Sequence, residues 1–232
     1  MNAVITGATK GMGKAIALKL AQAGYNLAIC SRNQPEIDSF CQQIMSQHPI
    51  HAVGLSTNCA EPLSVTAFVN FVQQQFQQVD VLINNVGIFN QGSILDEEES
   101  SLTTQLEVNF HTAYTLSRAF GRQMRDRRSG YIVNICSIAA INPVAEAGSY
   151  TVTKFALHGL TKVLRLELMK YNVKVTAILP GSTLTNSWEG TELPADRFVA
   201  AEDVANAVMF CLGSSAGSNP DEIIITPLRG QI

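Results

Sequence analysis

Short runs of β-branched and apolar residues alternate with amphipathic stretches along the whole chain. Most of these runs are solidly apolar, which is typical of strands covered on both faces of a sheet. Alternating strands and helices predict right-handed βαβ units, and therefore a doubly wound α/β fold with a parallel sheet. The expected strands are Ala3–Ile5, Asn26–Cys30, Ala52–Leu55, Val81–Asn84, Tyr131–Ile135, Val173–Leu179 and Glu222–Thr226.

Three amphipathic stretches are predicted as helices: Met12–Ala23, Ser101–Arg127 and Ser149–Tyr171. The first is followed by Gly24, a good C-terminal stop. No low-complexity tract, Pro-rich linker or charge run marks a boundary within the 232 residues. We therefore predict a single domain over residues 1–232, with a cofactor half at about 1–130 and a catalytic and substrate half at about 131–232.

Charge and composition exclude several function classes. A formal net charge of −3 argues against binding nucleic acid through general phosphate attraction. We expect no signal peptide and no membrane association, because the opening residues lack the signal pattern and no apolar run could span a bilayer. Scattered histidines predict no metal site. The five cysteines, without a CxxC pair, predict reduced thiols in a cytoplasmic protein: Cys30, Cys41, Cys59, Cys136 and Cys211.

The sequence TGATKGMG, from Thr6 to Gly13, follows the first expected strand and leads into a helix. Glycines at positions 7, 11 and 13 would let the backbone turn sharply and approach a pyrophosphate, which the N–H groups of a helix N-terminus bind. Glycine-rich turns between strand and helix are also common without a ligand. The position of this turn favours a dinucleotide site.

An acidic residue usually binds the ribose 2′-hydroxyl of NAD about 20 positions after such a turn. Here the second strand ends in Ser31-Arg32, and no Asp or Glu precedes Glu36, whereas Lys10, Lys14 and Lys19 do. A guanidinium group would bind the 2′-phosphate that a carboxylate would repel. This favours NADP(H), although Lys10 and Arg32 could also be solvated surface charges.

Tyr150 and Lys154 lie one helical turn apart on the same face of an expected helix. An ammonium group stabilises a neighbouring phenolate, which suits proton exchange with a substrate. Ser137 comes 13 residues before Tyr150, just after an expected strand, where its hydroxyl could bond a substrate carbonyl. Taken singly, these features are more often coincidence or turn chemistry.

Together with the glycine turn, these residues resemble the short-chain dehydrogenase/reductase family over nearly the whole chain. The matching elements occur in the family's order: TGATKGMG at Thr6, NNVG at Asn84–Gly87, Asn109, Ser137, YTVTK at Tyr150 and Pro180-Gly181. The resemblance implies a Rossmann fold of about seven strands. It also implies hydride transfer between NADP(H) and a carbonyl or secondary alcohol substrate.

By that resemblance, Tyr150 is the general acid for reduction and the base for oxidation. Lys154 holds the nicotinamide ribose, Ser137 polarises the carbonyl, and Asn109 organises a water linking Lys154 to solvent. Without the family, Asn109 is equally a helix-interior polar residue.

The implied cofactor residues include two departures from the family pattern: Asn58 stands where an Asp commonly meets the adenine, and Val86 replaces an Ala. Asn84 and Asn85 look structural and close to the cofactor. The cofactor set is Gly7, Thr9, Lys10, Gly11, Met12, Gly13, Ser31, Arg32, Asn58, Cys59, Asn85, Val86, Gly87, Tyr150, Lys154, Pro180, Gly181, Thr183 and Thr185.

Substrate and assembly are less constrained. We expect a homodimer or homotetramer formed through the two long helices, although the C-terminal segment lacks the family's frequent acidic-Gly-Gly ending. Ser182–Val199, with the single Trp188, is hypothesised to be a mobile lid. Five residues could line an apolar pocket or simply pack: Ile138, Ile141, Pro143, Val144 and Phe89.

Three alternative functions remain. One is a non-catalytic NADP(H)-binding sensor or scaffold. A second is a nucleotide-sugar epimerase or dehydratase, which would need a larger substrate domain. The third is a 3-oxoacyl-[acyl-carrier-protein] reductase, which a basic cluster of Arg125, Arg127 and Arg128 would suit. A solvated helix terminus explains these arginines equally well.

Overall fold

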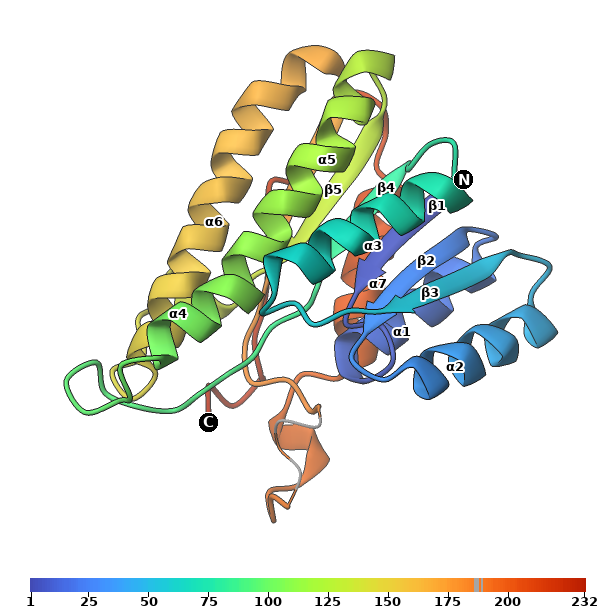
Figure 1. Ribbon diagram of the computed structural model, residues 1–232. Helices are drawn as coiled ribbons and strands as arrows, with labels where there is room; N and C mark the ends of the chain where they lie inside the picture. The colour runs from blue at the N-terminus through green and yellow to red at the C-terminus, as the bar shows by residue number, and fades with distance from the viewer. Residues whose placement is uncertain (186–187, 189) are drawn as a thin grey trace.

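In the computed structural model, seven strands form one parallel sheet in the order β3-β2-β1-β4-β5-β6-β7 (Figure 1). The structure describes residues 1–185, 188 and 190–232. Each strand boundary lies within one residue of its expected position, so the prediction of a doubly wound parallel sheet is confirmed. The strands are β1 Asn2–Thr6, β2 Asn26–Ser31, β3 Ala52–Ser56, β4 Val81–Asn84, β5 Gly130–Ile135, β6 Val173–Pro180 and β7 Glu222–Ile225.

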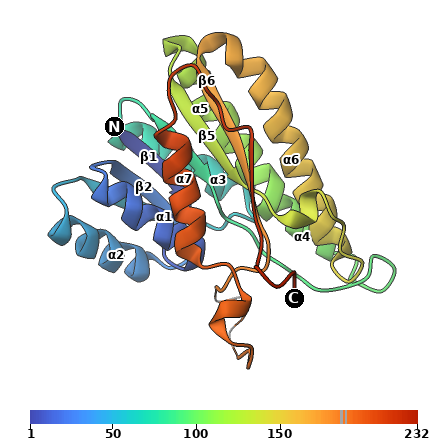
Figure 2. The ribbon, with the colours of Figure 1, turned by 180° about the vertical axis from the view of Figure 1, so that it is seen from behind.

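Helices cover both faces of the sheet, as Figures 1 and 2 show from opposite sides. One face carries α1 Gly11–Gln22, α2 Gln34–Gln47 and α7 Ala201–Leu212. The other carries α3 Pro62–Gln75, α5 Thr112–Arg127 and α6 Gly148–Leu168. Helices α2, α3 and α7 were not among the helices predicted from the sequence. The start of α2 is marked by Asn33, whose side chain accepts a hydrogen bond from the N–H of Glu36 at 3.2 Å.

Strand β1 explains why its sequence is continuously apolar. Ala3 and Ile5 pack into the core beneath α1 and α7, whereas Val4 packs into the core beneath α3 and α5. All three side chains are fully buried. Because successive side chains of a strand point to opposite faces, a strand between two helical layers needs an apolar residue at every position.

The predicted helix Ser101–Arg127 is a helix throughout, but it contains a π-helical turn that the sequence did not predict. It runs as α4 Ser101–Leu106, the π turn Glu107–His111, and α5. It ends at Arg128, which adopts a left-handed conformation with φ 58°. The π turn places Asn109 at its centre, and such turns are frequent at functional sites.

The predicted helix Ser149–Tyr171 is α6 followed by the 3₁₀ turn Met169–Tyr171. Ile138–Ala140 and Ala195–Arg197 also form 3₁₀ turns. Among the described residues, no helix is both long and apolar enough to cross a membrane.

Strand order reverses between β1 and β4, which places a crevice at the carboxyl ends of these neighbouring strands. The loops after β1, β4, β5 and β6 all end at this edge. This is where the residues singled out in the sequence meet.

Candidate active site

The glycine-rich turn between β1 and α1 is built around positions that only glycine fits. Gly7 and Gly11 have left-handed φ angles of 66° and 52°. A Cβ at Gly13 would overlap the carbonyl oxygen of Gly7, a backbone atom that cannot move aside. At Gly11 an added Cβ would lie 3.2 Å from the methyl of Thr185, so the segment that follows β6 packs against the turn. The glycines therefore leave an open cradle of backbone at the start of α1.

Asn85 locks this turn to the end of β4. Its Nδ2 donates to the carbonyl oxygens of Thr6 at 2.8 Å and Gly7 at 3.2 Å. The Thr6 hydroxyl in turn accepts the N–H groups of Asn85 and Val86, both at 2.9 Å. Within the described part of the chain, the buried Oδ1 of Asn85 has no hydrogen-bond partner. The cradle thus contains an acceptor that a ligand hydroxyl would satisfy.

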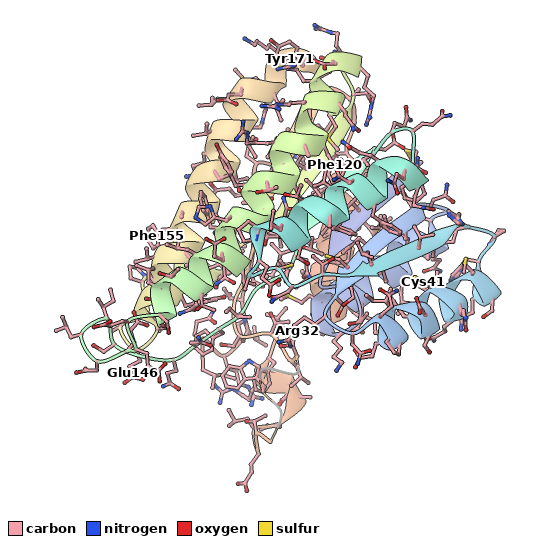
Figure 3. The ribbon with its side chains drawn as sticks, in the orientation of Figure 1. Arg32, Cys41, Phe120, Glu146, Phe155 and Tyr171 are labelled. Carbon is pink, nitrogen blue, oxygen red and sulfur yellow. The ribbon has the colours of Figure 1, made fainter. Side chains whose placement is uncertain are left out.

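Two cations flank the cradle. Lys10 forms an exposed ion pair with Glu36 at 3.3 Å. Arg32 follows β2, and Figure 3 places it at the lower edge of the sheet, on the same side as the segment after β6. Thr9 and Ser31 link the two loops through their hydroxyls at 2.9 Å.

The pKa of the buried Cys59 thiol is shifted by groups from several neighbouring segments. A hydrogen bond with the Cys30 thiol holds the pKa of Cys59 below its ordinary value despite burial, and Thr112 and the charge of Arg32 add to this effect. Asn58, beside it, uses its side chain internally. Its Nδ2 donates to Glu61 at 2.7 Å, and its Oδ1 accepts the N–H of Ala60 at 3.2 Å.

Lys154 is buried, and its Nζ donates to the carbonyl oxygen of Ile135 at the end of β5, at 3.2 Å. The ammonium also lies 5.6 Å from the centre of the Tyr150 ring. A Cβ added at Gly87 would be 3.4 Å from both Lys154 Nζ and Asn109 Oδ1. The structure therefore brings Gly87, Asn109, Tyr150 and Lys154 together.

Ser137 lies two residues beyond Ile135 and begins the 3₁₀ turn Ile138–Ala140. Its Oγ accepts the N–H of Ala139 at 3.1 Å. This bond fixes the hydroxyl oxygen and leaves its hydrogen free to be donated.

Asn109 uses its side chain as a clamp. Its Oδ1 accepts the N–H of Ile88 at 2.8 Å, and its Nδ2 donates to the Ile88 carbonyl and to the Thr153 hydroxyl, both at 3.0 Å. Both amide hydrogens are therefore committed. Ile88, Thr153 and Ile135 were missed in the sequence, because two act through backbone atoms and Thr153 through an ordinary hydroxyl.

The segment after β6 lies against the glycine-rich turn. Pro180 ends the strand, and Gly181 donates its N–H to Ile225 at 2.8 Å. Thr183 bridges to Val199 across the segment hypothesised as a lid. Part of that segment lies outside the described residues, so the lid stays a prediction.

Met12, another of the predicted cofactor residues, packs against the core from the first turn of α1.

A comparison with known protein families gives the family of the chain. The model of a family described as short chain dehydrogenase matches residues 1–194. The chain belongs to the short-chain dehydrogenase family. It is therefore an oxidoreductase with a Rossmann-like fold, as the resemblance implied.

Relatives of this short-chain dehydrogenase include an oxidoreductase of Staphylococcus aureus, 31% identical over 231 residues, covering 97% of this chain and 96% of the relative. A 3α-hydroxysteroid dehydrogenase of Mediterraneibacter gnavus is 28% identical over 233 residues, covering 96% and 93%.

Among solved structures, the L-sorbose reductase of Gluconobacter frateurii, complexed with NADPH and L-sorbose, is similar with a TM-score of 0.90 and 26% identity. The match covers 97% of this chain and 95% of that one. A metagenomic short-chain oxidoreductase in complex with NADP has a TM-score of 0.85 and 27% identity, covering 98% of this chain and 96% of that one.

The part of this short-chain dehydrogenase that the structure describes contains no group of three or more His, Cys, Asp or Glu side chains that could hold a metal ion.

Proposed function

We propose that this short-chain dehydrogenase is an NADP(H)-dependent reductase of ketones or aldehydes, and equally an alcohol dehydrogenase in the reverse direction. The observation that carries the proposal is the buried ammonium of Lys154, which bonds the last carbonyl of β5 and lies beside the ring of Tyr150. A buried cation next to a phenol stabilises the phenolate, which proton exchange with an alcohol requires.

The residues present fit a nicotinamide dinucleotide. The glycine cradle at the start of α1 offers backbone N–H groups to a pyrophosphate, and the unpartnered Oδ1 of Asn85 would accept a ribose hydroxyl. The neighbours solved with NADP or NADPH support the same class of cofactor.

A preference for NADP(H) is supported by the charges around the cradle. Arg32 and Lys10 are the cations available for a 2′-phosphate. The ion pair of Lys10 with Glu36 is exposed, so opening it would cost no more than about 1 kcal/mol. Arg32, which suits a bidentate contact with a phosphate, is the stronger candidate.

In the proposed mechanism, the reduced dinucleotide supplies the hydride. Ser137 donates a hydrogen bond to the substrate carbonyl oxygen, and Tyr150 donates its phenolic proton to the same oxygen. Lys154 stabilises the phenolate that remains. Its hydrogen bond to Ile135 keeps the ammonium at the tyrosine instead of in solvent.

Two further expectations belong to this proposal. The five cysteines are buried free thiols, which supports a cytoplasmic location. Helices α5 and α6 expose apolar side chains that suit a homodimer or homotetramer interface: Tyr114, Val152, Phe155, Val163 and Leu166. Light scattering after gel filtration would determine the assembly.

The test of the function is absorbance at the nicotinamide band, with NADPH and NADH separately, against ketones, aldehydes and 3-oxoacyl thioesters. We expect oxidation of NADPH with one carbonyl class. The Tyr150→Phe variant should lose at least about 100-fold in kcat yet bind NADPH as before. Tight NADPH binding without turnover across the panel would instead favour the sensor or scaffold.

A further inference from the structure

The ring of Phe89 packs edge-to-face against the ring of Tyr150, with centroids 5.0 Å apart and planes at 80°. Phe89 lies in the loop between β4 and α4, two residues after Gly87. Its side chain is 51% exposed, so half of it stays open beside the proposed proton donor. A substrate carbonyl that reaches Tyr150 would bring its neighbouring group against this open half.

The position of Phe89 is fixed by a closed circuit of contacts. Asn109 clamps both backbone groups of Ile88, the residue before Phe89. Asn109 also donates to Thr153, whose hydroxyl donates to the carbonyl oxygen of Tyr150 at 2.8 Å. The ring contact between Phe89 and Tyr150 completes the circuit. The phenyl group is therefore held in place relative to the tyrosine before any substrate arrives.

The rest of this loop is tied to the first turn of α6. Gly92 donates its N–H to the Glu146 carbonyl at 2.7 Å, and its own carbonyl accepts the N–H of Gly148 at 3.0 Å. The two loops lie side by side at the end of α6 that Figure 1 shows lowest. Glu97 adds a side-chain tie, because it accepts hydrogen bonds from Ser149 and from Ser101.

Apolar side chains are also exposed on the two loops that Gly92 and Ala147 join. Ile94 packs so closely on Gly148 that a Cβ there would overlap it, yet Ile94 is 61% exposed. Val144 is 44% exposed and is held by its backbone to the hydroxyl of Thr151. The hydroxyls of Ser149 and Thr151 are thus engaged within the protein. The exposed side chains of Phe89, Ile94 and Val144 therefore offer hydrophobic contact on these two loops.

We propose that Phe89 is a specificity-determining residue that selects carbonyl compounds with a flat, uncharged aryl ring next to the carbonyl carbon. The proposal rests on the proposed reductase function. An edge-to-face or offset contact with a ring is worth a factor of roughly 2 to 12 in binding. Glu146, exposed in the neighbouring loop before α6 (labelled in Figure 3), would disfavour an anionic group there.

The test compares acetophenone with 2-butanone, using NADPH and the variants Phe89→Ala, Phe89→Leu and Phe89→Tyr. Taking the ratio of kcat/KM for the two ketones in each variant cancels their different intrinsic reactivities. We expect Phe89→Ala to lower this ratio about tenfold and Phe89→Leu to lower it less. Phe89→Tyr, which keeps the ring, should leave the ratio near its wild-type value. Phe210, an exposed phenylalanine on α7, serves as the control, and Phe210→Leu should leave the ratio unchanged.

Binding is measured separately in the Tyr150→Phe background, where turnover does not interfere. Saturation-transfer NMR should detect acetophenone on this variant and a weaker signal after Phe89→Ala. Equal losses for both ketones, or acetophenone binding that ignores Phe89, would overturn the selection proposal while leaving the reductase function intact. A wild-type protein that reduces no carbonyl, yet binds acetophenone through Phe89, would overturn the reductase function alone.

Discussion

The ammonium of Lys154 donates to the carbonyl oxygen of Ile135, 19 residues earlier in the chain, at 3.2 Å. This bond joins α6 to the carboxyl end of β5 and fixes a positive charge beneath the Tyr150 ring. In consequence, the lysine has little freedom to move away from the tyrosine, whichever way the reaction runs.

Replacing Lys154 by methionine keeps the buried stem and removes the charge. We expect kcat to fall at least about 100-fold, because the phenolate loses its counter-charge. Lys162→Met, on the same helix but 62% exposed, should change kcat less than threefold. A Lys154→Met variant that keeps a tenth of the activity would contradict the role.

The Arg32→Asp variant tests the cofactor preference. If Arg32 contacts the 2′-phosphate, the ratio of kcat/KM for NADPH over NADH should fall by about 10- to 100-fold, the usual range for losing a charge-assisted contact. Arg122→Asp, the same charge change on the exposed side of α5, should leave the ratio alone. An unchanged ratio in Arg32→Asp would assign the preference to other groups.

Gly13→Ala tests the cradle. The added methyl would overlap the Gly7 carbonyl and the Asn85 amide, so the turn has to open. We expect a loss of about 1–3 kcal/mol in urea unfolding and a cofactor Kd raised at least tenfold, read by fluorescence titration. Gly159→Ala in α6 meets nothing within 4 Å and should be neutral or stabilising by up to about 1 kcal/mol. Similar effects in both variants would argue against a special cradle.

Burial on both faces made the strands easy to predict, because each needed an unbroken apolar run. The π turn at Glu107–His111 could not be predicted, since a run of helix-forming residues carries no sign of an extra residue in one turn. Helix α2 was not predicted, although Asn33 followed by Pro35 is a usual start of a helix.

The residues of the site were likewise only partly predictable from the sequence. Tyr150 and Lys154 could be found because helical spacing puts them on one face. The partners that orient them could not, because Lys154 bonds a backbone carbonyl and Asn109 clamps the backbone of Ile88. Backbone groups are common to all residue types, so only the tertiary structure reveals which one is used.

A buried series of hydrogen bonds links β4, β5 and α6 beneath the site, and its contribution to stability can be measured. Asn134 on β5 accepts from Asn84 Nδ2 at 2.7 Å and donates to the Thr161 hydroxyl at 2.8 Å. All three side chains are buried. Asn134→Ala would leave both partners short of a bond, so we expect about 1–3 kcal/mol of destabilisation in urea unfolding. Asn70→Ala, exposed on α3, should stay within about 0.5 kcal/mol of wild type. A loss that small in Asn134→Ala would show that these hydrogen bonds contribute little to stability.

Glu222 gives the protein a predictable acid sensitivity. Burial alone would raise the pKa of this carboxyl, but the hydrogen bond from His158 at 2.8 Å and the ammonium of Lys162 at 3.2 Å outweigh burial and lower it. A carboxylate whose pKa is lower in the folded state contributes stability above its unfolded pKa of about 4.3. That contribution is lost as the pH falls through the folded pKa.

Urea unfolding between pH 7 and pH 3 would measure this contribution as the difference in stability between wild type and Glu222→Gln. The difference should be positive near pH 6 and shrink toward zero in acid, because a protonated Glu222 resembles the glutamine. Glu98→Gln, an exposed carboxyl in the loop before α4, should show no such trend. A difference that stays constant with pH, or grows in acid, would mean that the pair with His158 and Lys162 does not stabilise the ionised carboxylate.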